Sequence, residues 1–141
     1  MKVLFLCTHN SCRSQMAEGW AKHLKKGVIE AWSAGTDPGT VNPLAIRVMA
    51  EAGVDISSHK SRHLQEFLDI PFDVVITLCG DARDTCPFFP GRSKRMMHRG
   101  FDDPSRAEGS PDEVLDFFRR VRDEIRDFVE GMPENLEQPG L

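Results

Sequence analysis

The stretch "KVLFLCTHNSCRSQMAEGWAKHL" at residues 2–24 joins a short apolar run, a polar loop and a segment with helical periodicity. The apolar run from Lys2 to Cys7 is typical of a strand that is buried on both faces of a parallel sheet. After the loop, apolar residues recur at helical spacing; we expect Ser14 to cap this helix and Gly27 to end it. The stretch therefore predicts a strand, loop and helix in succession.

The rest of the chain repeats this alternation. We expect further strands over residues 28–32, 72–79 and 94–101, and further helices over residues 42–53 and 110–131. Asn42 is the expected cap of the first of these helices, and Ser110 and Glu113 form a capping box before the second. The alternation predicts an α/β fold: one doubly wound domain with a four-stranded parallel sheet and helices on both faces. This domain spans residues 1–131, and residues 132–141 form a loose tail.

Length, composition and charge exclude several classes of function. A chain of 141 residues with 40% hydrophobic content is long enough for one domain with its own core. A net charge of -4 leaves no basic surplus for a nucleic-acid partner. The first apolar run is too short for a signal peptide or a membrane span, so we expect a cytoplasmic protein without membrane contact. Nothing in the sequence requires more than a monomer.

The first loop has the features of an anion cradle. Such a cradle needs consecutive backbone N–H groups and the N-terminus of a helix. The segment "CPFFPGR" at residues 86–92 has the same Cys-to-Arg spacing, but Pro87 and Pro90 remove two donors and no amphipathic helix follows. We therefore predict a single oxyanion-binding loop, which consists of Thr8, His9, Asn10, Ser11, Cys12 and Arg13.

Side chains around this loop suggest nucleophilic chemistry. Asn10 tolerates the left-handed conformation of a tight loop, and Arg13 can clamp two oxygens of a tetrahedral anion. The Arg13 charge and the helix dipole favour a Cys7 thiolate, to which Ser14 can donate. Cys7 is thus the expected nucleophile, whereas Cys12 has no assigned chemistry. The alternative is that Cys7 is merely a small buried hydrophobe and Arg13 an ion-pair partner.

A second cysteine pair follows a later strand. Cys79 ends the strand at 72–79, and Cys86 comes after a polar stretch. Because neighbouring strands lie about 5 Å apart, Cys79 can approach Cys7 and a thiol relay is possible. A zinc site is the competing interpretation, but the pairs have four and six intervening residues, whereas chelating turns usually have two. We predict no metal.

The motif "FDDP" at residues 101–104 offers an acid. It follows the last expected strand, and the residue before a proline is held extended, so the carboxyl of Asp103 can project over the site. Asp103 is our candidate general acid. The alternative is a turn or capping aspartate.

Together, "CTHNSCRS", "TLCGDARDTC" and "FDDP" resemble the thioredoxin-coupled arsenate reductases, which share the fold of low-molecular-weight protein tyrosine phosphatases. The resemblance implies that the Cys7 thiolate attacks arsenate held by Arg13, and that Asp103 assists the loss of water. It further implies that Cys79 attacks Cys7 to release arsenite, and that a Cys79–Cys86 disulfide then forms. No bound cofactor is implied, since reduced thioredoxin supplies the electrons.

Two positions depart from this family. His9 stands where the loop usually has glycine. Some relatives hold potassium through four residues, of which Asn10 and Glu18 match here, but the other two positions are Lys60 and Arg62. The sequence therefore predicts no potassium site, with the Lys60 ammonium standing in near Glu18.

Two other functions remain possible. A phosphatase would use Cys7, Arg13 and Asp103 and end with hydrolysis. Such phosphatases usually place aromatic residues after the acid-loop proline, whereas this chain reads "DDPSRAEG" and contains no tyrosine. A non-enzymatic oxyanion- or metal-binding module is the third candidate. We favour arsenate reduction over the phosphatase because a phosphatase would leave Cys79 and Cys86 without a task.

Overall fold

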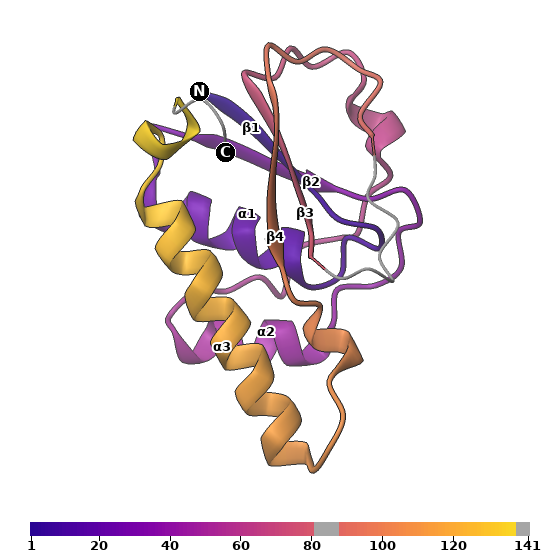
Figure 1. Cartoon of the computed structure of the whole chain (residues 1–141), viewed down its shortest axis with the longest axis vertical. Helices are drawn as coiled ribbons and strands as arrows, with labels where there is room; N and C mark the ends of the chain where they lie inside the picture. Colours follow the sequence, from indigo (N-terminus) through magenta and orange to yellow (C-terminus); the bar gives the residue numbers. More distant parts are fainter. Residues whose placement is uncertain (81–87, 138–141) are drawn as a thin grey trace.

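In the computed structural model, which describes residues 1–80 and 88–137, four parallel strands form one sheet in the order β2-β1-β3-β4 (Figure 1). The strands are β1 (Lys2–Leu6), β2 (Glu30–Ala34), β3 (Val74–Cys79) and β4 (Met96–Phe101). The α-helices are α1 (Arg13–Leu24), α2 (Pro43–Glu51) and α3 (Pro111–Glu130), and the 3₁₀ helices are η1 (Leu64–Phe67), η2 (Pro104–Arg106) and η3 (Glu134–Leu136). The predicted order of elements is confirmed.

Element boundaries differ where local hydrogen bonds compete. β2 begins at Glu30 and not at Val28, because the N–H groups of Val28 and Ile29 both bond to the carbonyl of Lys25 in the turn after α1. The expectation that Ser14 caps α1 is wrong: the cap position is Cys12, which makes no capping bond, and Ser14 lies inside the helix. Asn42 does cap α2 by accepting from the N–H of Leu44.

Helices α1 and α3 pack on one face of the sheet, and α2 packs against these two helices. One core cluster joins them to Val3 and Phe5 of β1. The opposite face, with Leu4 and Leu6, is covered by residues around η1 and by Phe89. The prediction of helices on both faces is therefore only partly right. Between β2 and β3 the chain also crosses to this second face, which the 3₁₀ helix η1 and loops cover.

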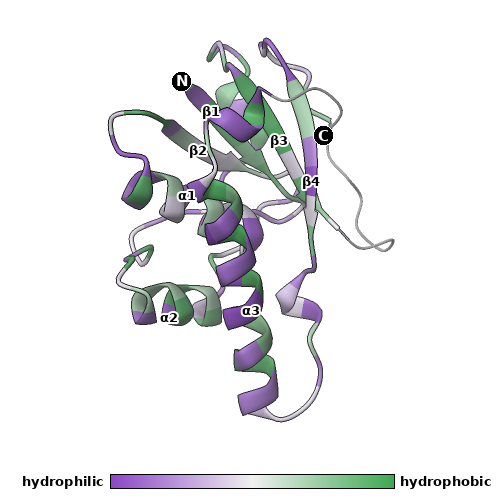
Figure 2. Cartoon of the chain, turned by 60° about the vertical axis from the view of Figure 1, so that its left-hand side comes forward, coloured by the Kyte–Doolittle hydropathy of each residue, from purple (hydrophilic) through white to green (hydrophobic). Residues whose placement is uncertain are grey.

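Helix α3 shows why the amphipathic pattern was a reliable guide. Its capping box between Ser110 and Glu113 is present. Figure 2 shows a hydrophobic side and a hydrophilic side along the helix. The side chains that it buries are Leu115, Phe118, Val121, Ile125 and Val129.

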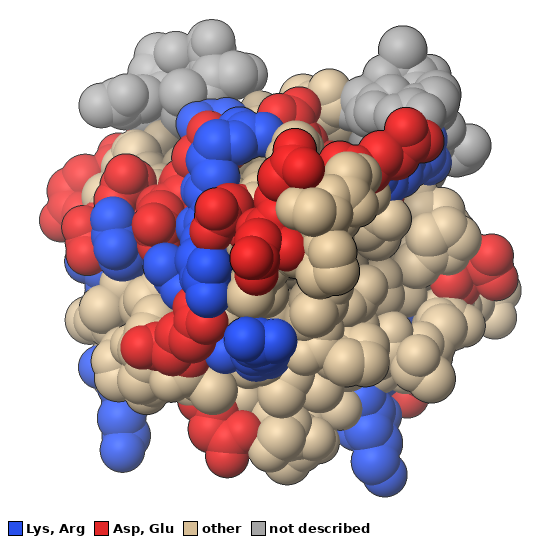
Figure 3. Space-filling view, turned by 90° about the horizontal axis from the view of Figure 1, so that it is seen from below, with Lys and Arg blue, Asp and Glu red and all other residues tan. Residues whose placement is uncertain are grey.

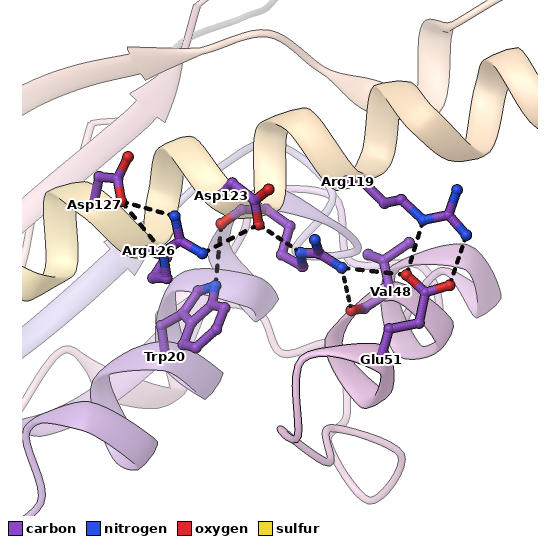
Figure 4. Close-up of polar contacts among 8 residues, drawn as sticks. Trp20, Val48, Glu51, Arg119, Asp123, Arg126 and Asp127 are labelled. Carbon is purple, nitrogen blue, oxygen red and sulfur yellow. Dashed lines mark hydrogen bonds and ion pairs between the residues drawn. The ribbon is translucent and has the colours of Figure 1, made fainter.

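The polar side of α3 ties the helices together. Arg122 donates to the carbonyl of Val48 near the end of α2 at 2.9 Å, and both Arg122 and Arg119 bond to Glu51 (Figure 4). The indole of Trp20 donates to the carbonyl of Arg122 at 3.1 Å. On the face shown in Figure 3, basic and acidic side chains lie next to one another.

The C-terminal part is more ordered than expected. Met132 and Leu136 are buried in the main core cluster, and Leu136 is the last residue of η3. The packed domain thus continues beyond residue 131, because these two apolar side chains complete the core beneath α3. Within the described residues, no helix has the length and apolar content to cross a membrane.

Candidate active site

The predicted loop follows β1. At this strand, the order in which the chain adds strands to the sheet changes direction. β1 pairs with β2 on one side and with β3 on the other, both in parallel. Ligands of open α/β sheets bind at such a switch point, beyond the carboxyl ends of the strands. Cys7 is the first residue after β1, and α1 begins at Arg13, so the loop lies where an anion site is expected.

Asn10 gives the loop its tight curvature. Its φ of 50° is the only positive φ of a non-glycine residue in the described parts of the chain. Its side chain is fully buried: the amide nitrogen donates to Ser14 Oγ at 2.7 Å, and the amide oxygen accepts from the N–H of Arg62 at 2.9 Å. These bonds offset the cost of a left-handed conformation.

The segment after β2 supports the loop from outside. The N–H groups of Asp37, Gly39 and Asn42 donate to the carbonyls of loop residues Thr8, His9 and Ser11, at 2.9, 3.2 and 3.0 Å. In a trans peptide, the N–H of the next residue points opposite to the carbonyl. The N–H groups that follow these three carbonyls therefore point toward the inner side of the loop, as a cradle for an oxyanion requires.

Gly35 lets this segment approach. A Cβ there would lie 2.5 Å from the carbonyl oxygen of Thr8 and 2.7 Å from that of Cys7. No side chain fits that space, so the contact between β2 and the loop depends on glycine.

The Cys7 thiol lies at the base of the loop. It is 3% exposed, and its Sγ is 2.8 Å from Ser14 Oγ. A thiolate can only accept, so Ser14 donates to the sulfur when Cys7 is ionised.

Arg13 connects the loop with the ends of two other strands. Its Nη1 donates to the carbonyl of Phe101 at 3.2 Å and to that of Leu78 at 3.5 Å. Its Nη2 lies 3.5 Å from Oδ2 of Asp103, and both side chains are buried. Arg13 thus brings the acid motif and the end of β3 to the loop.

Asp103 is also the cap of η2. Its Oδ1 accepts from the backbone N–H and the hydroxyl of Ser105, at 3.0 and 2.7 Å, while Arg106 lies 3.4 Å from Oδ2. The capping alternative from the sequence is therefore real, and it coexists with the position beside Arg13. Donors face both oxygens, which suits a carboxylate.

The cysteines differ in state. Cys79, the last residue of β3, is buried and disulfide-bonded, whereas Cys7 and Cys12 are free. Burial raises the pKa of Cys12 to about 12, so this thiol stays protonated. Cys86 lies outside the described residues.

His9 projects from the loop toward the supporting segment. Its Nδ1 is 3.0 Å from the carbonyl oxygen of Asp37 and 3.5 Å from the Asp37 carboxylate, and the imidazole is about half exposed.

Glu18 lies beside a cavity of about 450 Å³ that Lys60 and Arg62 also line. Lys60 lies on the same cavity as Glu18, as expected, but the partners of this carboxylate are Lys22, the Ser33 hydroxyl and, at 3.9 Å, His59. Lys22 is favoured because it lies one helical turn from Glu18 on α1.

Burial lowers the pKa of His59 despite the nearby carboxylate of Glu18. Among the residues that the structure describes, no cluster of three or more His, Cys, Asp or Glu side chains is placed to hold a metal ion.

Sequence reasoning missed two residues at this site. Gln15 is fully buried on α1 and bonds to Asn10, which its place among helical residues did not reveal. Gly35 was missed because its close contact with the loop joins distant parts of the chain. A small residue directly after a strand was the only available signal.

Known proteins share this architecture. The profile of the family "Low molecular weight phosphotyrosine protein phosphatase" matches residues 2–139. The arsenate reductase of Bacillus licheniformis is 49% identical over 135 residues, which cover 96% of each chain. That of Bacillus subtilis is 50% identical over 123 residues, 87% of this chain and 88% of the relative.

Solved structures agree with these relatives. An arsenate reductase in the phosphate binding state superimposes with a TM-score of 0.77 at 38% identity, covering 96% of this chain and 95% of its own. A thioredoxin-dependent arsenate reductase of Corynebacterium glutamicum has a TM-score of 0.61 at 26% identity, covering 97% of this chain and 63% of its own.

Proposed function

The chain belongs to the low molecular weight phosphotyrosine protein phosphatase family, and we propose that it is an arsenate reductase that works through a cysteine relay. The observation that carries the proposal is the placement of Cys7 and Cys79 at the carboxyl ends of neighbouring parallel strands, with Leu6 in register with Thr77. Strands so paired are about 5 Å apart, so the two sulfurs belong to one edge of the sheet. The names of the relatives support arsenate as the oxyanion.

The first step forms a bond between sulfur and arsenic. The Cys7 thiolate attacks arsenic(V), and one arsenate oxygen leaves as water with a proton from Asp103. Arg13 and the loop N–H groups hold the remaining oxygens. Asp103 must carry a proton when arsenate is bound in order to act as this acid.

The second step reduces arsenic. Cys79, as a thiolate, attacks the sulfur of Cys7, and the electron pair of the sulfur–arsenic bond passes to arsenic, which leaves as arsenite. Cys86 then attacks Cys79, which frees the Cys7 thiolate and leaves a Cys79–Cys86 disulfide. Two thiols thus supply the two electrons that take arsenic(V) to arsenic(III).

The state of the cysteines supports this order. Cys79 is disulfide-bonded, as the last step of the proposed relay requires, whereas Cys7 and Cys12 are free. We infer that reduced thioredoxin restores the dithiol, and the thioredoxin-dependent relative supports this donor. No bound cofactor or metal takes part in the proposed cycle.

The test compares two cysteine variants with the wild type. NADPH consumption with arsenate, thioredoxin and thioredoxin reductase should be continuous for the wild type and absent for Cys79→Ser. After prior reduction and without thioredoxin, Cys86→Ser should release one arsenite per enzyme and Cys79→Ser none. Equal consumption by the wild type and Cys79→Ser would contradict the relay. Hydrolysis of an aryl phosphate by a wild type that consumes no NADPH with arsenate would instead identify a phosphatase.

A further inference from the structure

Four buried or half-buried polar side chains form a continuous line that ends on the Cys7 sulfur. The line runs from His59 through Gln15 and Asn10 to Ser14. The successive distances are 3.0 Å from His59 Nδ1 to Gln15 Oε1, 2.9 Å from Gln15 Nε2 to Asn10 Oδ1, and 2.7 Å from Asn10 Nδ2 to Ser14 Oγ. The last distance, from Ser14 Oγ to Cys7 Sγ, is 2.8 Å.

Backbone groups fix the direction of both amides in this line. The N–H of Arg62 can only donate, so the Asn10 atom that it meets at 2.9 Å must be the oxygen. The carbonyl of Lys60 can only accept, so the Gln15 atom at 3.1 Å from it must be the nitrogen. Neither amide can flip without losing a bond to the backbone.

All hydrogens in the line therefore point toward the thiol. Since Gln15 presents its oxygen to His59, the imidazole donates through Nδ1. Gln15 then donates to Asn10, and Asn10 donates to Ser14. With one lone pair of its oxygen occupied in this way, the Ser14 hydroxyl is free to donate to the Cys7 thiolate.

Burial makes this order matter. Asn10, Ser14 and Gln15 are all 0% exposed, so water cannot replace a lost bond. Hydrogen bonds in such surroundings polarise one another along a chain.

We propose that Gln15, oriented by His59, is a positioning residue that sets the donor direction of the Asn10 and Ser14 side chains toward the Cys7 thiolate. The inference deepens the proposed function, because it rests on Cys7 as the nucleophile. Gln15 itself does not touch Cys7 in this account. It acts through Asn10, whose amide oxygen accepts from Gln15 as well as from the N–H of Arg62.

The experiment measures Cys7 alkylation by iodoacetamide against pH on the reduced full chain, with Cys7 labelling read by peptide mass spectrometry. Gln15→Leu should react about tenfold more slowly at neutral pH, since a hydrogen bond to a charged sulfur is weakened, and its profile should move up by about one pH unit. In His59→Leu the rate of Cys7 alkylation should fall roughly threefold, because this change removes only the donor at the outer end of the line.

Two controls separate positioning from a general structural effect. His59→Gln keeps an N–H donor for Gln15, so its Cys7 should be alkylated at a rate within twofold of that of the wild type. His23→Leu removes a histidine of α1 outside the line and should react like the wild type. If Gln15→Leu does not fold, the two His59 variants decide the matter.

Superimposed profiles of the wild type, Gln15→Leu and His59→Leu would overturn the proposal. So would a loss in His59→Gln as large as that in His59→Leu. Because alkylation needs neither arsenate nor thioredoxin, these results stay separate from any failure of arsenate reduction.

Discussion

Arg13 Nη2 lies 3.5 Å from Asp103 Oδ2, although 90 residues separate them in the chain and both side chains are buried. The contact joins the start of α1 to the loop after β4. It places the charge proposed to bind the oxyanion next to the carboxyl proposed to protonate the leaving oxygen. The pair therefore links binding and chemistry in the proposed reaction.

We expect Asp103→Asn to slow single-turnover arsenite formation by about 10²- to 10⁴-fold, because the amide cannot serve as general acid. Urea denaturation should show a loss of about 1–3 kcal/mol in the free energy of unfolding, since a hydrogen-bonded buried charge is removed. The neighbouring Asp102 is exposed and pairs with Arg120, so Asp102→Asn is the matched control and should keep its rate. An unchanged rate in Asp103→Asn would show that Asp103 is not the general acid.

Gly35→Ala should weaken oxyanion binding. Its Cβ would lie 2.5 Å from the carbonyl oxygen of Thr8, so the loop must shift and its N–H groups lose their alignment. We expect the inhibition constant for inorganic phosphate against arsenate reduction to rise roughly tenfold, equivalent to about one hydrogen bond. A Cβ at Gly39 meets nothing within 4 Å, so Gly39→Ala should leave the constant unchanged. Equal behaviour of the two variants would show that the close approach is unimportant.

Cys12 should stay unmodified where Cys7 reacts. Its pKa is raised to about 12 by burial, so almost no thiolate exists below pH 10. Iodoacetamide at pH 8 should therefore label the Cys7 sulfur of the folded, reduced protein and reach Cys12 only after denaturation in urea. Comparable labelling of both residues in the folded protein would refute the assignment of Cys12 as a packing residue.

Local signals in the sequence were sufficient for the first loop. The continuous apolar strand, the polar turn and the helix of residues 2–24 are adjacent in the chain, so their order predicted the position of Cys7 and the curvature at Asn10. The same locality explains the success with the capping box of α3.

Features that depend on distant contacts were not predictable in the same way. The pattern of apolar residues shows that a helix is buried, but not against which face of the sheet, so the position of α2 was missed. Gln15 and Gly35 bond to or approach residues that are far along the chain, and a single sequence contains no signal for such pairs. The pairing of Glu18 with Lys22 was not predicted, because the departure from the family pattern at Lys60 suggested a different ammonium group beside Glu18.

Potassium should not stimulate the enzyme. The Glu18 carboxylate already bonds to the Lys22 ammonium and the Ser33 hydroxyl, so its charge is balanced by a side chain of the protein. The rate of arsenate reduction should therefore be the same in KCl and in NaCl at equal ionic strength. A rise specific to KCl would show that Glu18 accepts the ion despite Lys22.

Glu51 predicts how stability depends on pH. Hydrogen bonding to Arg119 lowers its pKa from 4.5 to about 2. A carboxyl whose pKa is lower in the folded state stabilises the fold fully above about pH 4.5, and this contribution is lost as the pH falls toward 2. Glu51→Gln should therefore melt at a lower temperature than the wild type at pH 7, and the difference should shrink toward pH 2. Glu124→Gln breaks an exposed pair on α3 alone and should change the melting temperature little at either pH. A difference for Glu51→Gln that stays constant with pH would mean that packing, and not charge, joins α2 to α3.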